Sequence, residues 1–292
     1  MPLVTPGMFP LNSVSLKRYV ALIALFWVIP WVASAAPRIV VTMPWMAQWV
    51  ETLADRQVEV DILMPEGSDP HAFALRPSQA RLLARADLVV FVGDGSEAGI
   101  ESWLRQAPHL ALFAESEPEE GHHNKEEGHL HLHSWMDPDE MRLAAQRMTV
   151  RLGEILPGSD FAPALKWWLA NLDAFEDTLH LQASHHPDLY VVSSHGAALP
   201  LLEHIGIANG GWLAPPGGAP SPRTLTRLVA AMKRHGDPVV LAEPPHNAAL
   251  ARRVANEAGA RVVIWETLGR RDGGWLGMMG GNLDRLFGTV HE

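Results

Sequence analysis

The chain has 292 residues, of which 47% are hydrophobic and 19% are charged, so it can bury a large core in one domain or two lobes. Its formal net charge of -10 argues against nucleic acid as a partner. The sequence contains no cysteine, which excludes disulfides, thiolate metal sites and a lipid-bearing N-terminal cysteine. Any bound metal ion would therefore need histidine and carboxylate ligands.

Residues 1–35 have the pattern of a cleavable export signal. Lys17 and Arg18 precede an apolar run that ends in a small-x-small pattern at residues 33–35. This run is at the short limit for a membrane span and contains Pro30, which argues against a membrane anchor. We therefore expect cleavage at the end of this segment and an exported mature chain.

Short segments rich in β-branched residues alternate with helical stretches, which predicts an α/β fold with two parallel sheets. The segments are 38–43, 58–64 and 87–93 in a first set, and 189–194, 238–243 and 261–266 in a second. Each set has three strands with helical stretches between them, which is enough for a separate sheet covered by helices. We therefore predict an N-terminal lobe at 36–160 and a C-terminal lobe at 184–292.

One long amphipathic helix is predicted between the two sets of strands. From Phe161 to Leu179, apolar residues recur at alternating steps of four and three, which places them on one face of a helix of about six turns. Pro187 follows its end. We predict that residues 161–183 link the two lobes, with a metal site in the cleft between them.

Four potential metal ligands stand at the ends of predicted strands or at the start of a helix. His195 comes directly after a strand, and Glu266 ends the last one. His71 ends a Pro/Gly loop, and His133 lies just before a predicted helix. Ligands of open parallel sheets bind beyond the carboxyl ends of the strands. A single histidine is more often structural or exposed, but these positions together favour a shared site.

Three neutral imidazoles and one carboxylate suit the tetrahedral coordination of Zn²⁺. Ca²⁺ and Mg²⁺ prefer shells made of oxygen atoms, so they fit this set of ligands poorly. Because an imidazole binds a metal ion only when it is deprotonated, we expect the zinc affinity to fall steeply below about pH 6.

A Glu/His-rich segment of low complexity at 115–131 is predicted to be a surface loop. Its histidines could form a secondary zinc-binding group, or the loop could be a solvated charged segment without a binding function. These histidines are His122, His123, His129 and His131.

Three further residues follow a predicted strand end or a predicted ligand in the sequence. Glu243 ends a predicted strand and is a candidate for supporting the ligands, for serving as an alternative ligand, or for a purely structural role. Trp135 lies two positions after His133, and we expect its ring to form one side of the metal site and to exclude water. We interpret His246 as a loop histidine.

Four segments resemble the signatures of one known family, the periplasmic metal-binding proteins of zinc and manganese ABC importers. This ZnuA/TroA-like group is the cluster A-I, or cluster 9, solute-binding family. The segments are "LMPEGSDPHAFALRPSQARLLARADLVVFVG" (63–93), "HSWMDPDEMRLAAQRM" (133–148), "SSHGAALPLLEHIGI" (193–207) and "VVIWETLG" (262–269). The resemblance extends over essentially the whole mature chain.

The resemblance implies that His71, His133, His195 and Glu266 occupy the ligand positions, with Glu266 in place of the usual aspartate. It implies two α/β lobes bridged by a long helix. It also implies a periplasmic, monomeric binding protein that captures Zn²⁺ and delivers it to a membrane permease with a cytoplasmic ATPase. Zinc is favoured over manganese, because manganese-binding members usually have a carboxylate at the position of His195.

The resemblance thus predicts a binding protein and not an enzyme, but three alternatives stay open at the sequence level. The first is a manganese-binding or other divalent-metal-binding member of the same family, and the second is a metal-buffering or adhesive surface protein with the same fold. The third is a zinc hydrolase. Against the hydrolase, the sequence lacks His-Glu-x-x-His and Gly-x-Ser-x-Gly motifs, and Asp137 falls two positions too late for a His-x-His-x-Asp site.

Overall fold

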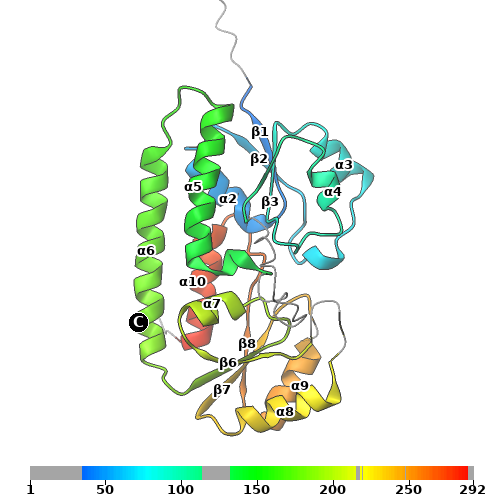
Figure 1. Ribbon diagram of the computed structural model, residues 1–292, viewed down its shortest axis with the longest axis vertical. Coiled ribbons are helices and arrows are strands. Elements are labelled where there is room, and N and C mark those ends of the chain that lie inside the picture. Colours follow the sequence, from blue (N-terminus) through cyan, green and yellow to red (C-terminus); the bar gives the residue numbers. More distant parts are fainter. Residues whose placement is uncertain (1–34, 114–131, 215–217, 219, 247, 289–292) are drawn as a thin grey trace, which may run out of the picture. The chain divides into compact units, whose positions relative to one another are not determined.

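The computed structural model describes residues 35–113, 132–214, 218, 220–246 and 248–288 (Figure 1). The predicted export signal, apart from Ala35, lies outside the described residues, and so do the four histidines of the predicted loop. Residues 36–292 belong to one compact unit.

The first sheet contains four parallel strands in the order β2-β1-β3-β4. The strands are β1 (Arg38–Val41), β2 (Glu59–Ile62), β3 (Leu88–Phe91) and β4 (His109–Ala111). The helical elements that accompany them are α2 (Pro44–Leu53), η1 (Pro70–Ala72), α3 (Pro77–Leu83) and α4 (Glu101–Leu104). In all three α-helices a proline or an acidic residue occupies the first turn, where the free N–H groups favour such residues.

The second sheet repeats this arrangement with the strand order β6-β5-β7-β8, again all parallel. The strands are β5 (Leu189–Ser193), β6 (Ala208–Trp212), β7 (Asp237–Ala242) and β8 (Arg261–Ile264). The accompanying helices are α7 (Leu199–His204), α8 (Pro222–Met232), α9 (Ala248–Ala258) and α10 (Gly274–Phe287). The predicted fold class, an α/β protein with two parallel sheets, is confirmed.

Along the chain, three helical elements lie between the last strand of the first sheet and the first strand of the second. They are η3 (Ser134–Met136), α5 (Pro138–Ile155) and α6 (Ala162–Ser184). The 23-residue helix α6 leads from α5 to β5 and runs beside α5 (Figure 1). Its buried side chains are the predicted apolar stripe, Trp168, Leu172, Phe175 and Leu179. The predicted long linking helix is therefore present, while the exact lobe boundaries stay a prediction.

All six predicted strands are present, but the sequence analysis missed β4 and β6. Both are edge strands, with the sequences HLA and ANGGW, and neither contains a β-branched residue. Edge strands gain their stability from one neighbour only, so their sequences need not carry a strong strand signal.

One apolar cluster extends beneath both sheets. It includes Ile39 and Val41 of β1, Val191 of β5, Val239 of β7 and Trp275 of α10. The opposite faces of the two sheets pack into two separate clusters. Burying one large apolar side chain contributes about 1.5–3 kcal/mol. The shared cluster therefore holds the two sheets together as parts of one folded unit.

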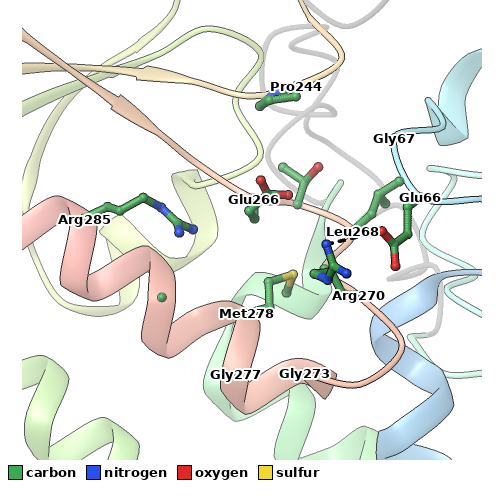
Figure 2. A pocket seen from close by; sticks show the side chains of 13 residues that line it. Glu66, Gly67, Pro244, Glu266, Leu268, Arg270, Gly273, Gly277, Met278 and Arg285 are labelled. Atoms are coloured by element: carbon green, nitrogen blue, oxygen red, sulfur yellow. Dashed lines mark ion pairs between the residues drawn. The ribbon is translucent and has the colours of Figure 1, made fainter.

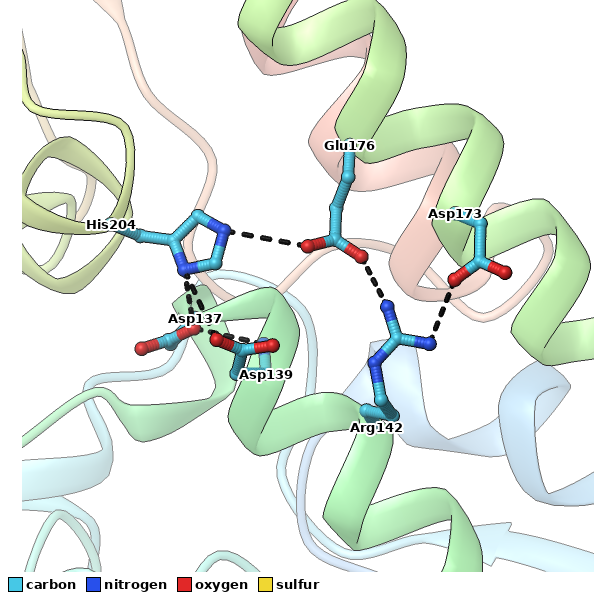
Figure 3. A network of polar contacts seen from close by, with 6 residues as sticks. All are labelled: Asp137, Asp139, Arg142, Asp173, Glu176 and His204. Atoms are coloured by element: carbon cyan, nitrogen blue, oxygen red, sulfur yellow. Dashed lines mark hydrogen bonds and ion pairs between the residues drawn. The ribbon is translucent and has the colours of Figure 1, made fainter.

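A network of charged side chains joins α5, α6 and α7 (Figure 3). Arg142 of α5 pairs with Asp173 (2.7 Å) and Glu176 of α6. Glu176 also faces His204 Nε2 at 3.4 Å, while His204 Nδ1 faces Asp137 at 3.2 Å. Partly exposed pairs of this kind contribute little stability one by one, but they fix the mutual orientation of the helices.

Within the part of the chain that the structure describes, no helix has both the length and the apolar character needed to cross a membrane.

Glu97 is a buried carboxyl group in the connection between β3 and α4, and only 2% of it is exposed. Its Oε2 accepts hydrogen bonds from the backbone N–H groups of Val92 (2.8 Å) and Gly93 (3.4 Å). Burial, with a smaller contribution from the nearby Asp94 charge, raises the pKa of Glu97 to about 8. The group is therefore protonated in the folded protein at neutral pH.

Because the pKa of Glu97 is higher in the folded than in the unfolded state, its contribution to stability is fully present below the unfolded-state pKa of 4.5 and is lost as the pH rises through about 8. We expect the free energy of unfolding of the metal-free protein to decrease between pH 6.5 and 9. In Glu97→Gln, which cannot ionise, this decrease should be smaller. Urea unfolding at several pH values measures both slopes, and equal slopes would contradict the raised pKa.

Candidate metal centre

Three of the four predicted ligands lie together. His71, His133 and His195 each offer a ring nitrogen within 4.8 Å of the others. Their ring centroids are 5.0–5.2 Å apart, and Nε2 of His71 lies 3.2 Å from Nε2 of His133. Two nitrogens bound to one tetrahedral Zn²⁺ at about 2.0–2.1 Å are about 3.3 Å apart. The cluster therefore has dimensions that suit one shared ion.

His71 is positioned by a short helical turn that follows β2. Asp69 precedes this turn, and its side chain accepts a hydrogen bond from the backbone N–H of His71 at 3.0 Å. Pro70 occupies the first position of the turn, where its missing N–H costs nothing. The sequence Asp-Pro-His thus encodes both the turn and the direction of the imidazole.

His133 has a left-handed backbone conformation, with φ of 66°, which is uncommon for a residue with a side chain. The next residue, Ser134, donates its backbone N–H to Asp94 Oδ2 at 2.9 Å. The other oxygen of Asp94 accepts from Ser96 N at 2.9 Å, so the carboxylate is itself held in place. Asp94 therefore stabilises the turn that presents His133, a role that sequence reasoning missed.

Trp135 forms one wall of the cluster. It is completely buried, and its ring meets that of His133 edge to face with centroids 5.2 Å apart. Its indole Nε1 donates to the carbonyl of Thr267 at 2.9 Å, while Trp275 Nε1 donates to the carbonyl of Trp135 at 2.6 Å. These hydrogen bonds tie the segment that carries His133 to the loop after β8 and to α10.

His195 is presented by a turn that a single buried carboxylate organises. Glu243, at the end of β7, is completely buried. Its two oxygens accept hydrogen bonds from Ser193 Oγ (2.6 Å), Ser194 Oγ (3.1 Å), His195 N (2.5 Å), Gly196 N (3.2 Å) and Ala198 N (3.2 Å). The negative charge of the carboxylate thus balances the N–H dipoles of the turn. Because the donors belong to the turn that carries His195, Glu243 supports this histidine.

Burial keeps the three imidazoles neutral. It lowers the pKa of His195 to about 3, with smaller contributions from His246 and His71. The pKa of His133 is held well below the usual value, first by burial and then by the charges of the neighbouring imidazoles. For His71, burial lowers the pKa and outweighs the opposing charge of Asp69. Neutral imidazole is the form that binds metal ions.

Glu266 lies apart from the three histidines. It is exposed and lines a different pocket, together with Glu66, Arg270 and Arg285 (Figure 2). Its backbone N–H and carbonyl are both hydrogen-bonded at 2.8 Å to the side chain of Asn282, which fixes the main chain there. Among the described residues, the group that could share an ion does not include Glu266, and its role as a ligand stays a prediction.

A fourth imidazole lies against the cluster. His246, in the loop between β7 and α9, stacks on His195 with ring centroids 3.7 Å apart and an angle of 19° between the ring planes. The sequence analysis placed His246 in a loop, which is correct, but it missed this contact. The signal was available, because His246 follows the carboxyl end of a strand, as His71 and His195 do.

Comparison with known proteins gives a consistent result. The family model described as "ZnuA: Zinc-uptake complex component A periplasmic" matches residues 39–287. The high-affinity zinc uptake system protein ZnuA of Yersinia pestis is 31% identical over 134 residues, which cover 36% of this chain and 42% of that relative. ZnuA of Haemophilus ducreyi is 25% identical over 252 residues, which cover 75% of this chain and 81% of the relative.

A solved structure, the periplasmic zinc-binding protein TroA from Treponema pallidum, has the same fold. The two superpose with a TM-score of 0.73 at 19% sequence identity, over 88% of this chain and 100% of TroA. This chain therefore spans all of that structure, but less than half of the Yersinia pestis relative.

We expect Glu243→Ala to destabilise the metal-free protein by about 2–4 kcal/mol, because buried N–H and hydroxyl groups would lose their acceptor. Glu266→Ala is the matched control: it removes an exposed carboxylate at the end of a neighbouring strand and should change the stability little. Chemical denaturation of both variants measures the difference. Equal stabilities would contradict the supporting role of Glu243.

Proposed function

Since this chain belongs to the family of the periplasmic component A of zinc-uptake complexes, we propose that it captures Zn²⁺ in the periplasm and delivers it to the permease of an ABC importer. The observation that carries the proposal is the cluster of His71, His133 and His195, whose ring nitrogens lie within the reach of one ion. The cargo in this proposal is the metal ion itself.

The chemistry of the cluster supports zinc as the cargo. Three neutral imidazoles are good ligands for Zn²⁺, whereas Mn²⁺ prefers more oxygen donors. In a buried site these nitrogens need little rearrangement, because the surrounding hydrogen bonds already fix the backbone of each histidine. The binding energy is then not reduced by the cost of ordering three separate loops.

The surroundings of the cluster suggest how an ion enters it. A cavity of about 330 Å³ lies beside the rings and is lined by Asp69, His71, Ser194, His195 and His246, among others. The buried ring of Trp135 does not line this cavity and covers the ring of His133, which keeps water away from it. An ion that reaches this cavity would exchange its water molecules for imidazoles one after another, with Asp69 attracting the cation.

We also propose roles for two segments that, apart from Ala35, lie outside the described part of the chain. Residues 1–35 would act as the cleavable export signal. The loop histidines His122, His123, His129 and His131 would form a secondary group that collects or buffers Zn²⁺. The mature protein would act as a monomer and hand its ion to a permease driven by a cytoplasmic ATPase.

The family match favours a binding protein over the zinc hydrolase that the sequence left open, because the family is one of zinc-uptake components. The proposal of a manganese-binding protein is disfavoured by the nitrogen-rich cluster.

Native mass spectrometry with competing Zn²⁺ and Mn²⁺ tests the proposal. We expect the wild type to retain one tightly bound zinc ion and to prefer zinc over manganese. His195→Ala should lose the tight ion, because it removes one of three imidazoles. A variant without residues 116–131 should keep the tight ion but bind fewer zinc ions in total. An unchanged total would refute the role of the loop, and a tight ion retained by His195→Ala would refute the site.

The pH dependence of zinc binding provides a second test, best made on the variant without residues 116–131. Three ordinary imidazoles with a pKa of 6.5 would together weaken zinc binding by about a millionfold at pH 4.5. The steep fall below about pH 6 that we expected from the sequence assumed such ordinary imidazoles. Because burial lowers the pKa of each histidine in the folded protein, fewer protons compete with the ion, and we now expect a fall that begins at a lower pH and is much smaller. Chelator competition measures this fall. A millionfold loss would contradict the lowered pKa values, and no loss would contradict ligation by histidine.

A further inference from the structure

A second group of side chains, apart from the three clustered histidines, could share a metal ion. Among the described residues, Asp137, Asp139 and His204 each offer one donor atom, and these atoms lie within 4.8 Å of one another. Nδ1 of His204 is 3.2 Å from Asp137 Oδ1 and 3.7 Å from Asp139 Oδ2 (Figure 3). Two donor atoms bound to one ion at about 2.1 Å are about 3.0–3.4 Å apart, so only the Asp139 side chain, which is 70% exposed, would need to move.

We propose that these three side chains bind a second divalent transition-metal ion where α5, α6 and α7 meet. Asp137 caps the first turn of α5, and its Oδ1 accepts a hydrogen bond from the backbone N–H of Asp139 at 2.9 Å. His204 is the last residue of α7. Both helices pack into the shared apolar cluster, α5 through Met141 and α7 through Leu201. The fold itself therefore brings the donor atoms together.

The opposite edge of the His204 ring faces another carboxylate. Nε2 lies 3.4 Å from Glu176 Oε1, while Arg142 holds the other oxygen of Glu176. A carboxylate in this position keeps the proton on the nitrogen that it faces and leaves the other nitrogen as a metal ligand. Nδ1 of His204 therefore presents its lone pair to the two aspartates.

A positive charge has to lie between Nδ1 and the two aspartates, because acceptor atoms that face one another repel. A proton on Nδ1 could supply this charge, but it would bind one oxygen along the direction of the N–H bond. Among the described residues Nδ1 makes no hydrogen bond, although Asp137 Oδ1 is only 3.2 Å away. A metal ion in front of Nδ1 places each oxygen to the side of that direction, which fits both contacts.

The charges around the group favour a cation. Burial raises the pKa of the Asp137 carboxyl, and burial and then the charge of Asp137 raise the pKa of Glu140. A bound cation would compensate for these negative charges. With one nitrogen donor, two oxygen donors and room for water beside the exposed Asp139, the site suits Mn²⁺ as well as Zn²⁺. We expect it to be weaker and less selective than the cluster of three histidines.

An ion at this place would connect two segments that carry ligands of the candidate metal centre. Asp137 lies four residues after His133, and α7 begins four residues after His195. The proposal goes beyond the proposed function, because the capture of zinc by the three histidines does not require a second ion.

Mn²⁺ broadens the NMR signals of nearby backbone amides, so it can locate the site in the zinc-loaded full chain. Asp139→Asn removes one charge from an exposed side chain, and His204→Gln removes the nitrogen donor. Asp173→Asn is the matched control, because it removes another exposed carboxylate of the same network that pairs with Arg142. His195→Ala removes a ligand of the candidate metal centre.

We expect substoichiometric Mn²⁺ to broaden first the amide signals of residues 139–141 and 203–205, in the wild type and in Asp173→Asn. Asp139→Asn and His204→Gln should lose this selective broadening, whereas His195→Ala should keep it. Equal broadening in the wild type and in Asp139→Asn would overturn the proposal. Broadening that is lost in His195→Ala would place the Mn²⁺ at the candidate metal centre and would overturn it too. A wild type without a tight zinc ion would overturn the proposed function alone, because the result with His195→Ala does not depend on that ion.

Discussion

The two parallel sheets share one apolar core, and the candidate metal centre depends on this shared packing. Val41 of the first sheet, Val239 of the second and Trp275 of α10 all belong to the same buried cluster. The hydrogen bonds from Trp275 to Trp135 and from Trp135 to Thr267 add a directional link across the molecule. Because the core fixes both sheets, loops that are about sixty residues apart in sequence meet without the help of an ion.

The buried polar groups around the site serve the same end by a different interaction. Asp94 and Glu243 are almost completely removed from water, which is costly for carboxyl groups unless backbone N–H groups compensate for it. Both are so compensated, and the turns that they hold present His133 and His195. The burial that imposes this cost also lowers the pKa of the histidines and keeps them ready for a cation. Preorganisation of the ligands and their neutrality therefore have a common origin.

The sequence predicted the elements whose signal is local. The strands rich in β-branched residues were evident, and so was the spacing of four and three between the apolar residues of α6. The strands β4 and β6 were missed, because β4 has only three residues and β6 contains a Gly-Gly pair, so neither shows a strand pattern. The ends of two predicted strands pointed to His71 and His195, and the start of a predicted helix pointed to His133. The sequence could not show that the Glu266 side chain lies in another pocket, because this depends on the conformation of the loop after β8. The roles of Asp94 and Glu243 depend on backbone hydrogen bonds that a residue pattern does not show.

The central claim is that three histidines from distant loops bind one ion. Anomalous diffraction at the zinc absorption edge, from crystals grown with one equivalent of Zn²⁺, tests it most directly. The account predicts one strong peak within bonding distance, about 2.0–2.1 Å, of a ring nitrogen of each of His71, His133 and His195. A strong peak at another place, with these three rings free of metal, would contradict it.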